Sequence, residues 1–427
     1  FLVPDLIKLV RCRLCNGDFS TEVLQLKPTP PANTLYKFQE DAISAKKFPL
    51  NVRMCSRCKH FQLTEIVNPK LLFDDYVYRT GTSTSFHKHF KDFVKSLEPW
   101  LKPNAMVLEV GSNDGLLLGL LRDAGFNVTG IEPSELLVAE SKAKKLNVHQ
   151  GYFDENFVAS NFGLTKFDLI VGNNVFAHIE NLSGAIELAG KMLNTGGTLV
   201  FEVAHFLKIL TDNTFDSIYH EHMSYHTVIS MQKYLQEFTE LEVYDVELIQ
   251  THGGSLRFYV GKKGEHKIRE SAIAEIIQVE INNGLDNSKV LIKIAEQINE
   301  LKRKVKKYFE KLKSDESLFL GYAAPAKAVT FLAELELENL GISLIIDDNP
   351  DKQNRFLPGS GIKIVSFAQA QEYFRSYKTA INQNVEYYCI FFAWNIGKEL
   401  YNKVKDLQLQ NLKVLSFYPT FSQEEIA

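Results

Sequence analysis

The chain has 427 residues, of which 45% are hydrophobic and 23% charged, and its net charge is −4. This length suffices for two to four domains of roughly 100–200 residues each. A sequence-independent nucleic-acid binder needs clustered Lys and Arg, which no long segment of this chain provides. No apolar run reaches the roughly 18–20 residues of a membrane helix. We therefore expect neither nucleic acid nor a membrane as partner, and we expect a monomer.

Two pairs of cysteines near the start of the chain have the spacing of zinc knuckles. Cys12 and Cys15 form the first C-x-x-C pair, and Cys55 and Cys58 form the second. Two such turns complete a tetrahedral Zn²⁺ site with no open position, so a structural zinc is predicted. A redox C-x-x-C is the alternative, but it would not need two copies. Metal binding in place of disulfides also indicates a reducing, cytoplasmic setting.

The clearest ligand-binding pattern follows a predicted buried strand at residues 105–110. The strand runs into Gly111-Ser-Asn113-Asp-Gly115 and then into a helix at 116–124. A glycine-rich turn at this place allows a ligand to approach the backbone and the helix N-terminus. Glu132 ends the next strand, where an acidic side chain can hold both ribose hydroxyls of an adenosine. The dinucleotide pattern G-x-G-x-x-G is absent, which disfavours NAD binding.

Later strands predict two successive α/β units. Asn174 and His178 follow the strand at 167–171, at the edge where ligands bind in open α/β sheets. A second strand–turn–helix pattern begins near residue 318, with Lys327 at its helix start and Asp348 after its next strand. This pattern predicts a smaller doubly wound domain that holds a nucleotide or covers the site.

The densest group of proton-carrying side chains is Tyr219-His220-Glu221-His222, followed by Tyr225 and His226. Histidine titrates near neutral pH, so two histidines beside a carboxylate suit general acid–base chemistry. A polar turn or strand with satisfied histidines is the structural alternative. A metal site fits less well, because Met223 stands where the helical zinc motif would have glutamate.

Together these motifs resemble one family, the C-methyltransferases that act on nucleotide-linked 4-keto deoxysugars. The resemblance covers almost the whole chain and departs at Ala323, where relatives often have glycine. The strings that carry it are Cys12-x-x-Cys15 with Cys55-x-x-Cys58, Tyr76-x-Tyr78, Glu109-Val-Gly-Ser-Asn113-Asp-Gly115, Ala177-His178, Ile218-Tyr-His-Glu-His222, His252-Gly-Gly-Ser-Leu-Arg257, Gly321-Tyr-Ala-Ala-Pro325-Ala-Lys327 and Asp348-Asn-Pro-Asp-Lys352.

The resemblance implies an α/β protein with three domains. These are a zinc-binding module at 1–75, a class I methyltransferase domain of Rossmann-like fold at 76–250, and a smaller Rossmann-like domain at 251–427 that binds the nucleotide sugar. The implied cofactors are S-adenosyl-L-methionine (SAM) and structural Zn²⁺. The implied substrate is a TDP- or GDP-linked 4-keto sugar, usually methylated at C3, although the family also contains enzymes that methylate C5. The alternatives are a zinc-ribbon RNA methyltransferase, which the acidic net charge disfavours, and an O- or N-methyltransferase of a small molecule.

Roles for individual residues follow from the same resemblance. We expect His222 to be the base, Glu221 to orient His222 or His220, and Tyr219 to donate a hydrogen bond to the developing enolate. Further donors to this enolate are expected from His178 and from Tyr76 or Tyr78. The residues expected to bind the cofactor are Glu109, Gly111, Asn113, Gly115, Glu132 and Asn174. The residues expected to bind the substrate are His220, His252, Ser255, Arg257, Lys327 and Asp348.

Overall fold

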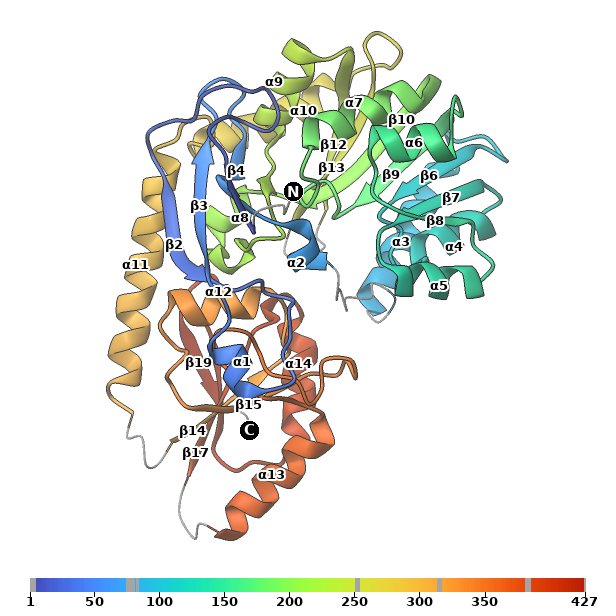
Figure 1. Cartoon of the computed structure of the whole chain (residues 1–427). Helices are drawn as coiled ribbons and strands as arrows, with labels where there is room; N and C mark the ends of the chain where they lie inside the picture. The colour runs from blue at the N-terminus through green and yellow to red at the C-terminus, as the bar shows by residue number, and fades with distance from the viewer. Residues whose placement is uncertain are drawn as a thin grey trace.

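A computed structural model describes residues 5–73, 81, 84–249, 254–312, 317–380 and 385–425. Figure 1 shows the sheet of an N-terminal module and a first α/β unit in its upper half. The second α/β unit lies in its lower half, with helix α1 (Gln39–Ile43) of the N-terminal module beside it. The predicted α/β architecture with an N-terminal cysteine module and two Rossmann-like units is confirmed. No helix among the described residues is long and apolar enough to cross a membrane.

The N-terminal module is built on a four-stranded antiparallel sheet in the order β11-β4-β3-β2. Buried and half-buried residues alternate along β3, so one face of this strand lies in the core and the other is partly exposed. The edge strand β11 comes from a distant part of the sequence, directly after the histidine cluster. The elements are β1 Leu6–Lys8, β2 Leu24–Thr29, α1 Gln39–Ile43, β3 Phe48–Met54, β4 Phe61–Leu63, β5 Glu65–Val67, α2 Pro69–Phe73 and β11 Ser224–Tyr225.

The first α/β unit has a seven-stranded sheet in the order β12-β13-β10-β9-β6-β7-β8. Strands β10 to β8 in this order are parallel, whereas β13 pairs antiparallel with both β10 and β12. Its strands are β6 Met106–Val110, β7 Asn127–Glu132, β8 Val148–Gln150, β9 Phe167–Asn173, β10 Leu193–Ala204, β12 Leu241–Ile249 and β13 Ser255–Lys262. Its helices are α3 Thr84–Leu97, α4 Leu116–Asp123, α5 Glu135–Ala143, α6 Glu155–Asn161, α7 Leu182–Met192, α9 Val228–Phe238 and α10 Glu270–Asn282.

Strand pairing crosses one expected domain boundary. A boundary at residue 250 would separate β12 from β13, but these strands are hydrogen-bonded neighbours from Leu241–Lys262 to Ile249–Ser255. Because the hairpin completes the first sheet, this unit extends past Lys262 and includes helix α10. The polar strings that follow residue 250 in the sequence therefore belong to the first unit.

The second α/β unit has a six-stranded sheet in the order β16-β15-β14-β17-β18-β19, of which only β19 is antiparallel to its neighbour. Its elements are β14 Ser317–Tyr322, α12 Lys327–Glu334, β15 Ile342–Ile346, β16 Ile364–Val365, α13 Phe367–Ala380, β17 Glu386–Phe391, α14 Gly397–Lys405, β18 Leu412–Ser416 and β19 Ser422–Glu425. In both units the first strand lies between the strands that follow it on either side. Ligands bind outside the carboxyl ends at such a switch point.

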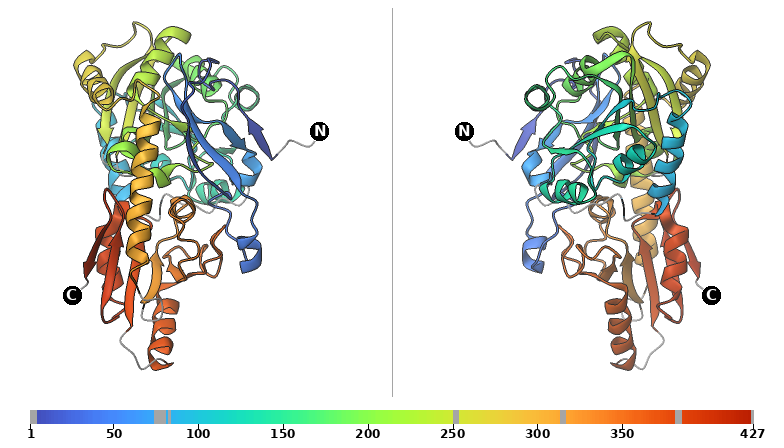
Figure 2. Two further views of the ribbon diagram at one scale, coloured as in Figure 1. Left: turned by 90° about the vertical axis from the view of Figure 1, so that its left-hand side faces the viewer. Right: turned by 90° about the vertical axis from the view of Figure 1, so that its right-hand side faces the viewer.

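One hydrophobic core joins the three parts. It contains residues of β2 and β3, of segment 206–225, of helix α12 and of the long helix α11, Val290–Phe309. Figures 1 and 2 show α11 running along one side of the molecule from the upper half toward the second unit. Its buried stripe consists of Val290, Leu291, Ile294, Ile298, Leu301 and Val305, which recur at the spacing of one helix face.

A strained residue at the switch point of the second unit gives a prediction about stability. Ala323 follows β14 with φ of 64°, a conformation that costs an L-residue about 1–2 kcal/mol and glycine almost nothing. We expect Ala323→Gly to raise the free energy of unfolding by up to about 1 kcal/mol after the added entropy of the unfolded chain is counted. Urea denaturation measures this change. Ala324→Gly is the control: Ala324 is buried, and its substitution should lower stability, so equal losses in both variants would contradict the prediction.

Candidate functional site

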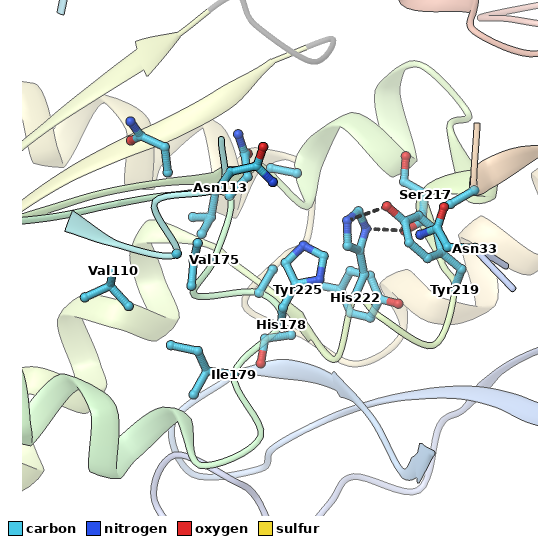
Figure 3. A pocket seen from close by; sticks show the side chains of 18 of the residues that line it. Asn33, Val110, Asn113, Val175, His178, Ile179, Ser217, Tyr219, His222 and Tyr225 are labelled. Carbon is cyan, nitrogen blue, oxygen red and sulfur yellow. Dashed lines mark hydrogen bonds between the residues drawn. The ribbon is translucent and has the colours of Figure 1, made fainter. Parts of the chain in front are cut away.

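A cavity of about 1460 Å³ lies between the two α/β units and is lined by residues of all three parts of the chain. At one end it reaches the glycine turn after β6, and at the other it reaches the start of α12 in the second unit. Figure 3 shows His178 and His222 in the middle, with Val110 and Asn113 on one side and Tyr219, Ser217 and Asn33 on the other. The cavity therefore joins the predicted cofactor end to the histidine cluster.

The cofactor end is formed where β6 and β7 finish. Gly111 has φ of 69°, and a Cβ at this residue would lie 2.4 Å from Val175 Cγ2, so only glycine fits the turn. Glu132 accepts hydrogen bonds from the backbone N–H of Asn113 and of Ser134, both at 2.9 Å. Burial raises the pKa of Glu132, and these two N–H donors favour its charged form. An acidic acceptor beside a glycine turn fits the ribose of an adenosine.

Four of the six residues expected to bind the cofactor line the cavity, namely Gly111, Asn113, Glu132 and Asn174. Glu109 lies behind this wall: burial raises its pKa well above the ordinary range, and the nearby Glu132 and Asp114 carboxyls raise it further. Gly115 caps α4 with φ of 78° and also lies outside the lining. Glu109 and Gly115 therefore support the turn, in place of the cofactor contacts that were expected for them.

Asn173, at the end of β9, is a lining residue that the sequence analysis missed. Neither its side-chain Oδ1 nor its Nδ2 has a hydrogen-bond partner among the described residues, although both atoms are buried. A buried amide without a partner is costly, so a polar ligand group in the cavity would stabilise it. Its position at the carboxyl end of a central strand could have marked it, as it did for Asn174. This orphaned amide, with the glycine turn and Glu132, fits a nucleoside cofactor such as SAM.

His222 lies at the centre of a hydrogen-bond chain on the cavity wall. Its Nδ1 is 2.8 Å from the Ser217 carbonyl oxygen, which can only accept, so Nδ1 carries the proton. Nε2 of the neutral ring is therefore the acceptor, and the Tyr219 hydroxyl donates to it at 2.7 Å. Figure 3 shows both contacts as dashed lines. This arrangement leaves a basic nitrogen at the cavity, next to a hydroxyl donor.

His178 lies beside His222 on the loop after β9. The two imidazole rings are 4.9 Å apart between centroids and meet edge to face. Burial lowers the pKa of His178 to about 4, so this ring is neutral at neutral pH. The loop is held against the histidine cluster because the Ala177 carbonyl accepts from the backbone N–H of Met223 at 2.9 Å and of Ser224 at 3.2 Å. His178 thus lies next to the histidine cluster, as its expected role requires.

The expected roles of Glu221 and His220 require correction. The Ser217 carbonyl, and not the Glu221 carboxylate, is the partner that orients His222. Glu221 Oε1 instead accepts from Asn33 Nδ2 at 3.1 Å, and Glu221 is buried outside the cavity lining. His220 is also fully buried and contacts the Phe48 carbonyl through Nε2 at 3.3 Å, so it does not face the substrate.

The far end of the cavity carries two lysines of the second unit. Lys327 lines it with its ammonium 4.4 Å from the centre of the Trp394 ring, and Trp394 Nε1–H donates to Asp216 Oδ2 at 3.2 Å. Lys352 also lines it and donates to the Ala324 carbonyl at 2.8 Å. Burial lowers the pKa of Lys327 and raises that of Asp216 to about 6. This end therefore suits an anionic group of a ligand.

Three other residues expected to bind the substrate lie outside the lining. Arg257 lies in β13, where its Nε–H donates to Glu202 Oε1 at 2.7 Å and Nη1 lies 3.1 Å from Glu247. Ser255 is buried in the same strand. Asp348 is exposed and pairs with Lys403 at 2.6 Å. These side chains are buried within the fold or form their contacts at its surface, so the expectation that they contact the substrate is corrected. Tyr76, Tyr78 and His252 lie outside the described residues.

The four N-terminal cysteines form one buried cluster. Their Sγ atoms all lie within 4.8 Å of one another, with Cys12–Cys58 at 3.6 Å and Cys15–Cys55 at 3.4 Å, and none forms a disulfide. Tetrahedral zinc with Zn–S bonds of about 2.3 Å needs sulfurs at such separations. Asn16 and Lys59, with φ of 56° and 64°, follow the two knuckles and turn the chain back over them. The thiol set fits the predicted structural zinc.

Three protein-family models match consecutive parts of the chain. A putative zinc binding domain matches residues 12–73, a methyltransferase domain matches residues 85–239, and a C-methyltransferase C-terminal domain matches residues 250–419. The first two matches fall in the cysteine module and the first α/β unit. The third begins at β13 and α10 of the first unit and continues through the second unit.

Two individual methyltransferases are also similar to the chain. The chain is 28% identical over 411 residues to the C-methyltransferase NovU of Streptomyces niveus, covering 95% of this chain and 94% of that protein. It is 27% identical over 115 residues to the ubiquinone biosynthesis O-methyltransferase of Azorhizobium caulinodans, covering 26% of this chain and 45% of that protein.

Solved structures match the chain only weakly. Magnesium protoporphyrin IX methyltransferase (ChlM) from Synechocystis PCC 6803 is 18% identical, with a TM-score of 0.33, and the match covers 42% of this chain and 83% of that one. The PH0226 protein from Pyrococcus horikoshii OT3 is 16% identical, with a TM-score of 0.36, and the match covers 44% of this chain and 95% of that one.

The matched domains agree with the geometry at both ends of the molecule. The cysteine cluster provides the zinc site, and the glycine turn with Glu132 provides the SAM site, so structural zinc and SAM are the cofactors. Over nearly its whole length the chain is similar to SAM-dependent C-methyltransferases that carry an N-terminal zinc-binding domain.

Proposed function

We propose that the chain methylates a nucleotide-linked 4-keto deoxysugar at C3, with His222 as the base. The observation that supports this most directly is the hydrogen-bond chain from Tyr219 through His222 to Ser217 on the cavity wall. It offers an unprotonated ring nitrogen and a hydroxyl donor 2.7 Å apart. These are the two groups that the enolisation of a ketone requires.

The first chemical step is removal of a proton from C3. The neighbouring ketone acidifies this C–H, because the electron pair left behind is delocalised onto the carbonyl oxygen. Nε2 of His222 takes the proton, while Nδ1–H stays on the Ser217 carbonyl. That hydrogen bond becomes stronger in the imidazolium, since its donor is then charged. A histidine base contributes roughly 10²–10⁴ in rate, so positioning and enolate stabilisation provide the rest.

Tyr219 changes its acceptor during this step. In the structure its hydroxyl donates to Nε2, the lone pair that has to receive the substrate proton. When the substrate is bound, the hydroxyl turns to the ketone oxygen, where negative charge develops. A donor aimed at such an oxygen is worth about 2.7–4 kcal/mol in acyl-transfer enzymes. Bound SAM would supply the methyl group that the carbon nucleophile takes up.

The substrate class is supported by the two ends of the cavity. SAM belongs to the end formed by Gly111 and Glu132, and the histidine cluster lies between that end and the second unit. Lys327 and Lys352 at the far end suit the diphosphate of a nucleotide sugar, because they place positive charge where the diphosphate would lie. His178 remains a proposed donor to the enolate beside His222.

The role of His222 as the base is tested by proton exchange. His222→Gln should slow the exchange of the C3 proton of a TDP-linked 4-keto-6-deoxyhexose with D₂O by about 100-fold or more, because no other base replaces Nε2. The affinity for SAM should stay within about twofold. Mass spectrometry follows the exchange, and calorimetry follows SAM binding. His266→Gln is the control, since His266 contacts the Gly197 carbonyl outside the cavity lining. Exchange at the wild-type rate in His222→Gln would remove His222 as the base.

The enolate donor is tested by removing one oxygen atom. Tyr219→Phe should lower kcat for methyl transfer by about 10²–10³, the usual cost of losing one donor to an oxyanion. SAM binding should be unaffected. Tyr234→Phe is the matched control, because Tyr234 is buried and its hydroxyl contacts Glu187 at 3.4 Å away from the cavity lining. Unchanged kcat in Tyr219→Phe would contradict the proposed donor.

The buried carboxyl of Glu221 should make the stability of the folded chain depend on pH. Burial raises its pKa from 4.5 to about 7, so the folded chain keeps a proton that the unfolded chain releases. Glu221 therefore contributes stability that is fully present below pH 4.5 and lost as pH rises through about 7. The loss is on the order of 3 kcal/mol. Urea denaturation from pH 4.5 to 8 should show this decline in the wild-type protein and a smaller decline in Glu221→Gln. Identical pH profiles would contradict it.

A further inference from the structure

Arg13 lies between the two cysteines of the first zinc knuckle, yet its side chain reaches the catalytic loops. Its Nε–H donates to the Glu180 carbonyl at 3.0 Å, and its Nη2 donates to the Ile179 carbonyl. Its Nη1 donates to the Met223 carbonyl at 2.9 Å and to Ser224 Oγ at 3.2 Å. One guanidinium therefore bonds two segments that are remote from it and from each other in sequence.

These acceptors follow directly after the two histidines of the site. Ile179 and Glu180 come after His178, and Met223 and Ser224 come after His222. The two loops also touch each other through the Ala177 carbonyl, which accepts from both the Met223 and the Ser224 backbone N–H. Arg13 adds a second bridge between the same two loops.

The knuckle holds Arg13 in a fixed frame. The Arg13 backbone N–H donates to Gln62 Oε1 at 2.9 Å, and Gln62 of β4 pairs with Ser224 of β11. The side chains of Cys12 and Cys15 on either side belong to the buried thiol cluster. The guanidinium is thus anchored by the sheet and by the metal site, while its donors face the loops.

We propose that Arg13 is a positioning residue, through which the zinc knuckle holds the His178 loop and the His222 loop in the geometry needed for proton removal. This proposal rests on the proposed function, because it takes His222 as the base. It gives the zinc module a task in catalysis beyond the stability of its own sheet. A displacement of about 1 Å at such a site can lower a rate about 100-fold.

Arginine suits this position for a geometric reason. A guanidinium has five N–H donors in a rigid planar fork, and lysine has one compact ammonium. Lysine at residue 13 can retain the charge but cannot reach the carbonyls of both loops at once. The Ile179 and Met223 carbonyls lie in part-buried surroundings, where the loss of a donor is costly, so the loops would shift to satisfy them.

The test compares Arg13→Lys and Arg13→Gln with Arg11→Lys and Arg11→Gln. Arg11 is the matched control, because its side chain is 53% exposed and pairs with Asp18 at the surface. We expect the Arg13 variants to keep one zinc per chain and SAM affinity within about twofold, but to lose at least about tenfold in kcat. We expect the Arg11 variants to match the wild-type protein. Elemental analysis, calorimetry and turnover of the TDP-linked 4-keto sugar give these readouts.

A second readout does not depend on turnover. In protein labelled with ¹⁵N-histidine, the Nδ1–H signal of His222 is assigned by its loss in His222→Gln. It should shift or broaden in Arg13→Gln and stay in place in Arg11→Gln. If the wild-type protein does not act on the 4-keto sugar, the proposed function fails while this signal still decides the role of Arg13.

Three results would overturn the role of Arg13. An unchanged His222 signal in Arg13→Gln would show that the loops do not depend on the guanidinium. A wild-type kcat in both Arg13 variants would show that turnover does not depend on the guanidinium. Loss of zinc or of folding in Arg13→Lys, as well as in Arg13→Gln, would make Arg13 a folding residue of the knuckle and nothing more.

Discussion

One backbone carbonyl, that of Ser217, decides which nitrogen of His222 carries the proton. It accepts from Nδ1–H and so leaves the lone pair of Nε2 at the cavity. The position of this carbonyl depends on segment 214–227, which contacts every part of the molecule. Thr330 of α12 donates to the Ile218 carbonyl at 2.9 Å, Trp394 donates to Asp216, and β11 pairs with β4. The tautomer of a single imidazole thus depends on contacts from the zinc module and from the second α/β unit.

Burial keeps three histidine rings around this segment uncharged. Burial lowers the pKa of His178 and His220 to about 4 and that of His226 to about 3, so these rings are neutral at neutral pH. A proton that arrives on His222 therefore meets no neighbouring imidazolium that would repel it. The neutral surroundings come from burial by residues of both the zinc module and the first α/β unit.

Local patterns made much of the fold predictable. The C-x-x-C pairs, the glycine turn with Glu132 and the apolar stripe of α11 each depend on residues close in sequence, and each was found where the pattern placed it. The mistakes have a common cause. Arg257 was expected at the substrate because it belongs to a string that resembles the family, but its partner Glu202 lies on a neighbouring strand. The bonds of Arg13 to Glu180 and Met223 join residues too distant in sequence for any local pattern to indicate them.

The pairing of β11 with β4 has a consequence for the newly made chain. Strand β4 ends at Leu63, and the residues that cover its edge, Ser224 and Tyr225, are synthesised roughly 160 residues later, on the order of 10–30 s at usual rates of translation. During that time the zinc module exposes an unpaired strand edge, which is a site for pairing with other chains. The segment that carries His222, the proposed base, thus also closes this edge, so a chain interrupted before residue 224 lacks more than its proposed active site.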